Sequence, residues 1–207
     1  MARSRSSAQW LRRHVDDPFV KKAKAQGMRS RAVYKLQEID VKDRLLKPGA
    51  RVVDLGAAPG SWSQYAAQKA GATGKVVAVD LLEIVPMPGV LILRGDFLDD
   101  SVVAHVREAL EGKPADVVLC DLSPNLSGIA SADQARAAAL TESAIAFCRE
   151  CLAPGGVFLV KVFQGAEFQP LLAELKRTFV SVQTRKPAAS RDESRETYQL
   201  CRGLRGR

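Results

Sequence analysis

Apolar residues along this chain fall into short runs that alternate with stretches of helical periodicity. Runs bounded by Gly, Pro or Asp predict strands at 51–55, 75–81, 90–93, 116–122, 156–163, 179–183 and 196–202. Apolar residues three and four positions apart predict helices at 61–70, 101–110, 133–152 and 167–177. This alternation predicts an α/β fold, in which a mostly parallel seven-stranded sheet carries helices on both faces.

One more helix is predicted ahead of the first strand. Apolar residues recur at helical spacing between residues 30 and 46, with Ser30 as a candidate N-cap and Pro48-Gly49 as the end. The length of 207 residues suits a single α/β domain. We therefore expect one domain over residues 29–207, preceded by a basic segment over residues 1–28.

A single charged residue interrupts the apolar pattern inside a predicted strand. Residues 158–163 read Phe-Leu-Val-Lys-Val-Phe, and the ammonium of Lys161 would be costly to bury without a partner. Asp121 stands near the end of the preceding predicted strand. If the two strands are neighbours, the carboxylate of Asp121 can meet Lys161 at one edge of the sheet.

A loop of small residues follows the first predicted strand and opens a helix. It reads Asp-Leu-Gly-Ala-Ala-Pro-Gly-Ser-Trp over residues 54–62, and its small side chains let a ligand approach the backbone. The loop is neither the Gly-x-Gly-x-x-Gly of dinucleotide sites nor a P-loop. It therefore suits a cofactor without phosphate, such as S-adenosylmethionine.

Carboxylates also end the next predicted strands. Asp80 ends the second strand, where it can accept both hydroxyls of a ribose, and Asp96 follows the third, where it can reach an adenine amino group. Taken singly, each aspartate fits a turn or a helix cap equally well. Acids at successive strand ends, in a series that begins with the Gly-rich loop, together favour a nucleoside cofactor at the carboxyl edge of the sheet.

Charge is divided unevenly along the chain, whose overall net charge is +8. Residues 1–47 carry a net charge of +8 and residues 176–207 one of +6, whereas residues 48–175 carry −6. Basic ends are common as solvated tails, but these two together can also form a phosphate-binding surface. The basic helix has too few large apolar residues on one face to favour a membrane, and no apolar run reaches 18 residues.

Cysteine usage indicates no metal or redox chemistry. Cys148 and Cys151 have CxxC spacing, but no second CxxC is present, and the only histidines are His14 and His105. No secretion signal precedes them. We expect reduced thiols, no metal site and a cytoplasmic protein.

Several stretches together resemble the FtsJ-type ribosomal RNA large-subunit methyltransferase family, over nearly the whole chain from about Trp10 to Arg202. The matching stretches are 27–32, 54–65, 121–128, 160–165 and 194–198. The resemblance implies a Rossmann-like fold that uses S-adenosylmethionine to methylate a ribose 2′-hydroxyl of a uridine in 23S rRNA, on the large ribosomal subunit. One departure is Ser61, where many relatives have glycine; serine is favourable at a helix start, so we expect no loss of activity.

The resemblance also implies the site residues. The family's Lys-Asp-Lys-Glu tetrad falls on Lys35, Asp121, Lys161 and Glu196. Its cofactor contacts fall on Gly60, Trp62, Asp80, Asp96 and Asp121. From spacing alone, Lys35 and Glu196 would be taken for surface charges.

The expected roles follow from the chemistry of the reaction. A ribose hydroxyl is a poor nucleophile, so the protein must align its oxygen and help to remove its proton. We expect Lys161 to be the general base, or the residue that steers the oxygen, with Asp121 orienting it. Lys35 and Glu196 would hold the target ribose.

Three alternatives stay open at this point. Relatives that methylate tRNA or an mRNA cap share the tetrad, although the short chain favours the ribosomal substrate. A catalytically idle RNA-binding assembly factor would lack turnover, and an NAD-linked dehydrogenase is disfavoured by the glycine pattern. We expect a monomer that binds ribosomal RNA and neither DNA nor membrane.

Overall fold

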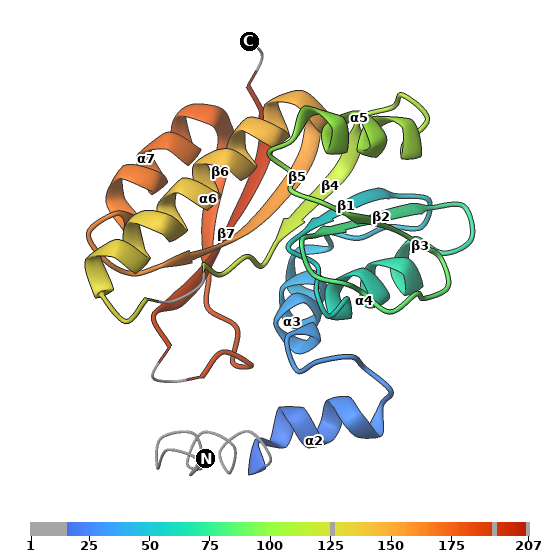
Figure 1. Ribbon diagram of the computed structural model, residues 1–207, viewed down its shortest axis with the longest axis horizontal. Coiled ribbons are helices and arrows are strands. Elements are labelled where there is room, and N and C mark those ends of the chain that lie inside the picture. Colours follow the sequence, from blue (N-terminus) through green and yellow to red (C-terminus); the bar gives the residue numbers. More distant parts are fainter. Residues whose placement is uncertain (1–15, 125–126, 192–193, 206–207) are drawn as a thin grey trace.

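The computed structural model describes residues 16–124, 127–191 and 194–205. Within them, seven strands form one sheet in the order β3-β2-β1-β4-β5-β7-β6 (Figure 1). The strands are β1 Arg51–Leu55, β2 Lys75–Asp80, β3 Val90–Arg94, β4 Ala115–Cys120, β5 Leu152–Phe163, β6 Phe179–Arg185 and β7 Glu196–Leu204. Strands β1 to β5 are parallel, and β7 runs antiparallel to both β5 and β6.

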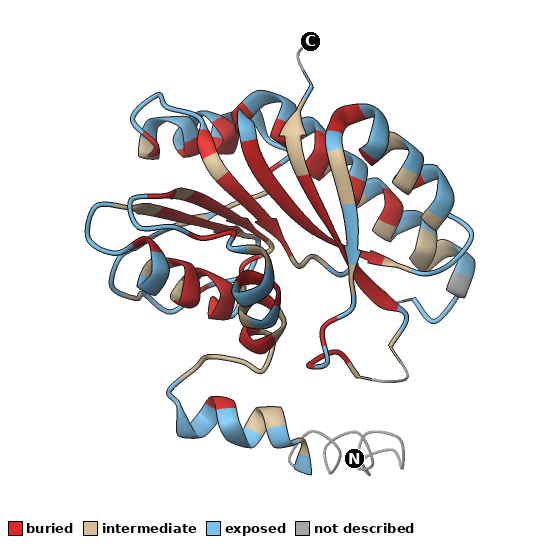
Figure 2. Cartoon of the chain, turned by 180° about the vertical axis from the view of Figure 1, so that it is seen from behind, coloured by how far each residue is buried: buried red, intermediate tan, exposed pale blue. Residues whose placement is uncertain are grey.

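Helices cover both faces of this sheet. On one face lie α3 (Val33–Asp43) and α4 (Ser61–Ala70); on the other lie α5 (Asp100–Ala109), α6 (Ala130–Cys151) and α7 (Phe168–Thr178). Alternate residues of the central strands join one apolar cluster or the other, which explains their continuous apolar runs. Figure 2 shows these strands buried between the two helical layers. The predicted fold class is confirmed.

Some predicted boundaries were wrong. The helix expected from residue 30 begins only at Val33, and its N-cap is Ala32, not Ser30. It ends at Asp43, before Pro48, because Arg44 adopts a left-handed conformation with φ of 53°. Helix α6 begins at Ala130, ahead of the predicted 133, and β5 begins at Leu152, ahead of the predicted 156.

Helix α2 (Pro18–Ala25) was not predicted from the sequence. Oδ1 of Asp17 accepts hydrogen bonds from the first-turn amides of Phe19 and Val20, and Pro18 occupies a first-turn position. An Asp-Pro pair of this kind is a recognised start signal for a helix. The ring of Phe19 lies 5.6 Å from that of Tyr34, so α2 packs on α3. The boundary proposed at residue 28 stays a prediction, and residues 1–15 lie outside the described part.

Candidate active site

Lys161 is buried among oxygen atoms as well as apolar side chains. Its Nζ donates to the carbonyl oxygen of Asp121 at 2.9 Å and to Oγ of Ser123 at 2.6 Å. The same nitrogen lies 3.2 Å from Oδ1 of Asp121. Two hydrogen bonds and one ion pair therefore compensate the burial of the ammonium group.

The register of the sheet explains why these residues meet. Strands β4 and β5 pair in parallel with Cys120 opposite Val160, which brings Asp121 beside Lys161 at the carboxyl edge. The two strands are neighbours, which was the condition set for the two side chains to meet. Ser123 was missed, although it stands only two residues after Asp121 in the same loop.

Tyr198 holds the Asp121 carboxylate from the next strand. It lies opposite Lys161 in the antiparallel pairing of β5 with β7, and its phenol donates to Oδ1 of Asp121 at 2.9 Å. Burial raises the pKa of Tyr198 well above its ordinary value, and the charges of Asp121 and Glu196 raise it further. The phenol therefore stays a hydrogen-bond donor that fixes the carboxylate. Tyr198 was also missed; its signal was its place two residues after Glu196, on the same side of a strand.

Lys35 and Glu196 form an ion pair within the site. Nζ of Lys35, on α3, lies 2.5 Å from Oε1 of Glu196 at the start of β7, and the two side chains are 13% and 11% exposed. Burial alone would raise the pKa of Glu196, but the positive charges of Lys35 and Lys161 hold it below its ordinary value. The pair is therefore part of the protein interior and not the surface charge that spacing alone suggested.

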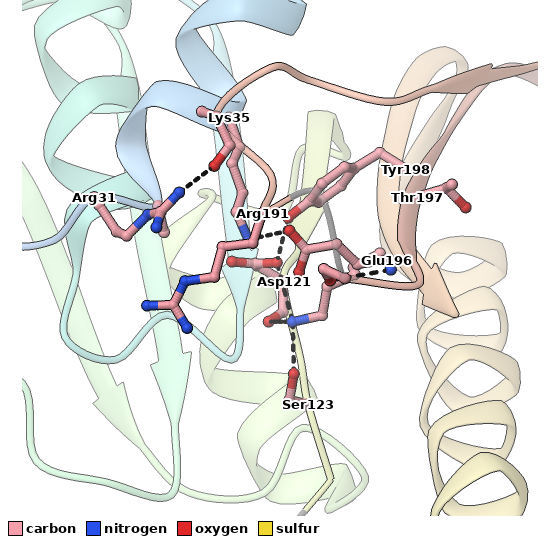
Figure 3. Close-up of polar contacts among 12 residues, drawn as sticks. Arg31, Lys35, Asp121, Ser123, Arg191, Glu196, Thr197 and Tyr198 are labelled. Carbon is pink, nitrogen blue, oxygen red and sulfur yellow. Dashed lines mark hydrogen bonds and ion pairs between the residues drawn. The ribbon is translucent and has the colours of Figure 1, made fainter. Parts of the chain in front are cut away.

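The predicted tetrad gathers around the ring of Tyr198. Nζ of Lys35 lies 5.9 Å from the centroid of that ring. The hydroxyl of Tyr198 donates a hydrogen bond to the Asp121 carboxylate, which lies beside Lys161. Figure 3 shows Lys35, Asp121 and Glu196 converging on Tyr198 from separate segments of the chain. The structure thus brings together all four residues from α3, the β4 loop, β5 and β7.

A cavity of about 300 Å³ opens beside the Lys35–Glu196 pair. It is lined by Arg31, Ala32, Lys35, Arg191, Ser194 and Glu196. Arg31 is fixed by the Asp17 carboxylate and donates to the carbonyl oxygen of Ala189. Arg191 is 39% exposed, and its Nε lies 3.8 Å from the same carboxylate. Three positive side chains and one negative line this wall, which favours an anionic ligand such as a phosphate.

The glycine-rich loop after β1 packs tightly against neighbouring loops. Gly56 has φ of +71°, and a Cβ there would lie 2.2 Å from Cδ2 of Leu122. Gly60 has φ of +98°, and its Cβ would lie 2.4 Å from Cε of Met87. Side chains are therefore excluded at both positions. Helix α4 then begins at Ser61, so that its first-turn amides can attract a negatively charged group.

Asp80 and Asp96 lie at the carboxyl ends of β2 and β3 as predicted. The two carboxylate oxygens of Asp80 accept the amides of Ala58 and Leu82, each at 2.8 Å. Oδ1 of Asp96 accepts the amide of Leu98 at 3.0 Å. Both residues are thus turn-forming, and each carboxylate retains lone pairs for a further donor.

The side chain of Trp62 is turned away from the loop edge. The indole is 2% exposed, its Nε1 donates to the carbonyl oxygen of Ala32 at 2.8 Å, and its ring lies 5.7 Å from that of Tyr198. The indole therefore ties α4 to α3 behind the site. Any contact of Trp62 with a cofactor would have to come from its backbone.

Asp54 is buried at the end of β1, behind the same loop. Its Oδ2 accepts a hydrogen bond from Oγ of Ser63 at 2.6 Å, and its Oδ1 has no partner among the described residues. Burial raises the pKa of Asp54 to about 7, partly offset by Ser63 and reinforced by the charges of Asp121 and Asp80. The carboxyl edge of the sheet is thus rich in acidic groups.

These groups fit a cationic nucleoside cofactor. The carboxylates of Asp80 and Asp96 suit ribose hydroxyls and an amino group, while the α4 amides suit a carboxylate. Asp121 stands between this region and Lys161. The donor and acceptor set therefore matches the chemical groups of S-adenosylmethionine.

Among the described residues, no cluster of three or more His, Cys, Asp or Glu could hold a metal ion. The described part of the chain also contains no helix with the length and apolar content needed to cross a membrane. Cys148 and Cys151 are free and buried on α6, and burial raises the pKa of both thiols. Their CxxC spacing thus places two side chains in the core under α6.

The fold and the site are those of a Rossmann-like methyltransferase. This strand order is combined with a glycine-rich loop after β1 that is not a phosphate-binding loop, and with a buried lysine at the neighbouring strand ends. The chain belongs to the FtsJ-like methyltransferases, because the model of that family matches residues 28–204. The family predicted from the sequence is confirmed.

Relatives of the same family align with the whole chain. Ribosomal RNA large subunit methyltransferase E of Methylobacillus flagellatus is 52% identical and covers 100% of this chain and 99% of its own length. The protein of the same name from Pseudomonas aeruginosa is 50% identical over 100% of both chains. A crystal structure assigned as a ribosomal RNA methyltransferase from Plasmodium falciparum has 30% identity, a TM-score of 0.76, and covers 86% of this chain and 100% of its own.

Proposed function

We propose that this protein transfers the methyl group of S-adenosylmethionine to the ribose 2′-hydroxyl of a uridine in 23S rRNA of the large ribosomal subunit. The observation that carries the proposal is the buried Lys161, held by Asp121 and Ser123 and standing beside the Lys35–Glu196 pair. The names of the relatives, which share about half of their residues with this chain, support the ribosomal substrate.

The cofactor would lie along the carboxyl ends of β1 to β4. Asp80 would hold its ribose, Asp96 its adenine amino group, and the backbone from Gly60 to Trp62 its amino-acid end. Asp121 would face its positive charge. When bound there, the cofactor supplies a methyl group that is already activated for transfer, so the protein's task is to prepare the oxygen.

Lys161 would hold the 2′-hydroxyl in line: as the neutral amine it would receive the hydroxyl proton, and as the ammonium it would only steer the oxygen. Asp121 restricts the position of Lys161 Nζ through its carbonyl oxygen and its carboxylate. Tyr198 in turn holds that carboxylate by a hydrogen bond from its hydroxyl. Alignment of the oxygen and assistance with its proton are together the main contributions available to such a site. Lys35 and Glu196 would hold the target ribose from the cavity side.

The cationic cavity would receive the RNA backbone next to the methylated ribose. Arg31, Lys35 and Arg191 line it, and both basic ends of the chain contribute. A 2′-hydroxyl is absent from DNA, so the reaction itself selects RNA. All four tetrad residues come from one chain, which supports a monomer, and we place the reaction in the cytoplasm, on the ribosomal subunit.

The test is Lys161→Ala, assayed by methyl transfer to large subunits from cells that lack the enzyme. We expect transfer to fall by about 100-fold or more, with cofactor binding measured by calorimetry retained. Lys113→Ala, an exposed lysine before β4, is the control and should behave like the unmodified protein. Full transfer by Lys161→Ala with normal cofactor binding would contradict the role.

The same assay separates the remaining substrates. Free 23S rRNA, tRNA and capped mRNA are offered beside the large subunit, and methylated riboses are mapped in each. We expect the signal on a 23S rRNA uridine in the subunit. Preferential methylation of tRNA or a cap would replace the ribosomal substrate, and binding of RNA without any turnover would favour an idle assembly factor.

A further inference from the structure

A second cavity lies at the carboxyl end of β5, apart from the cationic one. It has a volume of about 180 Å³, and Phe163, Pro124 and Ala137 form much of its lining, with Arg195, Gln134 and Gln164 around them. None of these residues lines the 300 Å³ cavity beside Lys35. We refer to the smaller cavity as the Phe163 pocket.

The strand geometry places this pocket next to Lys161, the candidate general base. Residues 161 and 163 are two apart on β5, so their side chains leave the same face of the strand. Nζ of Lys161 lies 5.6 Å from the centroid of the Phe163 ring. A nucleotide whose 2′-oxygen reaches Lys161 can therefore place its base near this ring.

Phe163 is the accessible aromatic side chain in this neighbourhood. Tyr198 and Trp62 are 0% and 2% exposed, because both rings pack between the sheet and its helices. Phe163 is half-buried and lines a cavity. Among the described aromatic residues of the site, it can thus offer a face to a planar ligand.

The pocket has a fixed wall and a cationic neighbour. Oε1 of Gln134 accepts the amide of Ala166 at 3.2 Å, and a Cβ at Gly165 would lie 2.7 Å from the Gln134 amide group. The α6 wall therefore closes tightly on the loop after β5. On the other side, the carbonyl oxygen of Arg195 accepts a hydrogen bond from the amide of Gln164 at 2.8 Å. This bond holds the segment that contains Arg195 against the same loop.

Asp133 is the one acid in the lining, and its carboxylate is committed elsewhere. It accepts hydrogen bonds from the amide and hydroxyl of Ser127 and from the amide of Gly128. These hydrogen bonds hold the pKa of Asp133 below its ordinary value. The remaining lining side chains are apolar, carry an amide, or, for Arg195, carry a positive charge. The apolar and amide groups suit a neutral planar nucleotide base, and the arginine suits the neighbouring phosphate.

We propose that the Phe163 pocket holds the base of the nucleotide whose ribose is methylated, stacked on Phe163, with Arg195 toward the adjacent phosphate. The inference rests on the proposed function, since it takes Lys161 as the position of the 2′-oxygen. Single-stranded RNA bases splayed from a helix are commonly bound by such stacking on an aromatic ring. Phe163 would then be a specificity-determining residue for the reaction.

The test compares Phe163→Leu with Phe163→Tyr on 23S rRNA in which the target nucleotide is either normal or abasic. Loss of one stacking contact should lower kcat/KM for normal RNA by roughly 10- to 100-fold in Phe163→Leu, while the tyrosine variant stays near the unmodified protein. Phe168→Leu is the matched control, since Phe168 is also half-buried but does not line the pocket. Cofactor affinity should be unchanged in all three.

The abasic RNA decides where the base lies. If the target base stacks on Phe163, abasic RNA should lower kcat/KM of the unmodified protein by about the factor that Phe163→Leu shows on normal RNA. On abasic RNA, Phe163→Leu should then lower kcat/KM little further. An equal loss by Phe163→Leu on normal and abasic RNA would overturn the proposal, as would normal activity of Phe163→Leu. Absence of any ribose methylation by the unmodified protein would instead contradict the proposed function, so the two failures are distinguishable.

Discussion

At the scale of single residues, Lys161 and Asp54 differ in how far polar contacts compensate their burial. Lys161 makes two hydrogen bonds and one ion pair. Asp54 has one hydrogen bond, from Ser63, and an Oδ1 with no partner among the described residues. A buried carboxylate with so little compensation favours its protonated form. The two residues therefore differ in what their charge contributes to the stability of the fold.

The raised pKa of Asp54, about 7, predicts a specific dependence of stability on pH. The pKa of Asp54 is higher in the folded protein than its unfolded value of about 3.9. Its contribution to the free energy of unfolding is therefore fully present below about 3.9 and is lost as pH rises through 7. Asp54→Asn does not titrate. Its melting temperature relative to the unmodified protein should rise between pH 5 and pH 8.

The measurement is thermal unfolding at several pH values without added cofactor. Glu83→Gln, which replaces an exposed carboxylate after β2, is the control and should show no such trend. A difference in melting temperature between Asp54→Asn and the unmodified protein that stayed constant from pH 5 to pH 8 would rule out a titrating Asp54.

At the scale of elements, the sheet was predictable where local pattern and topology agree. Strands β1, β2, β4 and β5 carry continuous apolar runs because both faces are covered, and the strand order places Asp80, Asp96 and Asp121 at one edge of the sheet. Lys161 was noticeable because it broke such a run. These features are local in sequence, so pattern alone could identify them.

The remaining site residues depend on long-range packing. Strand β7 is inserted between β5 and β6, which brings Glu196 and Tyr198 next to Lys161. Lys35 reaches the same place only because α3 packs on that face of the sheet. Spacing along the chain contains neither fact, and family resemblance was needed to identify Lys35 and Glu196.

Helix α2 provides a prediction at this scale, because one carboxylate both caps it and contacts Arg31 of the cationic cavity. Asp17→Ala should destabilise the helix locally by about 1 to 2 kcal/mol and release Arg31. We expect faster hydrogen exchange over residues 18–25 and a higher KM for RNA. Asp17→Asn should keep the cap, and hence slow exchange, while losing the charge opposite Arg31.

The neighbouring Asp16 is the control for this experiment. Its side chain is 78% exposed, and its Oδ1 lies 3.8 Å from Nζ of the exposed Lys21. Asp16→Ala should therefore leave both exchange and KM unchanged. Equal exchange rates in Asp16→Ala and Asp17→Ala would show that Asp17 does not hold the helix.

At the scale of the whole molecule, an acidic central part of the chain and two basic ends meet at the candidate site. Residues 48–175 carry a net charge of −6, whereas residues 1–47 and 176–207 carry +8 and +6. Arg31 and Lys35 come from the first basic part and Arg191 from the last, and all three line one cavity. The division of charge thus separates the surface proposed for a cationic cofactor from the one proposed for RNA.

This division predicts the salt dependence of RNA binding. Each cation that neutralises a phosphate releases counterions, so affinity should fall linearly with the logarithm of salt concentration. Arg191→Gln should reduce that slope by about 1 if Arg191 holds one phosphate. Arg107→Gln removes a similarly exposed cation, paired with Glu150 on the α5–α6 side, and should leave the slope unchanged. Equal slopes for the two variants would show that the 300 Å³ cavity does not bind the RNA backbone through Arg191.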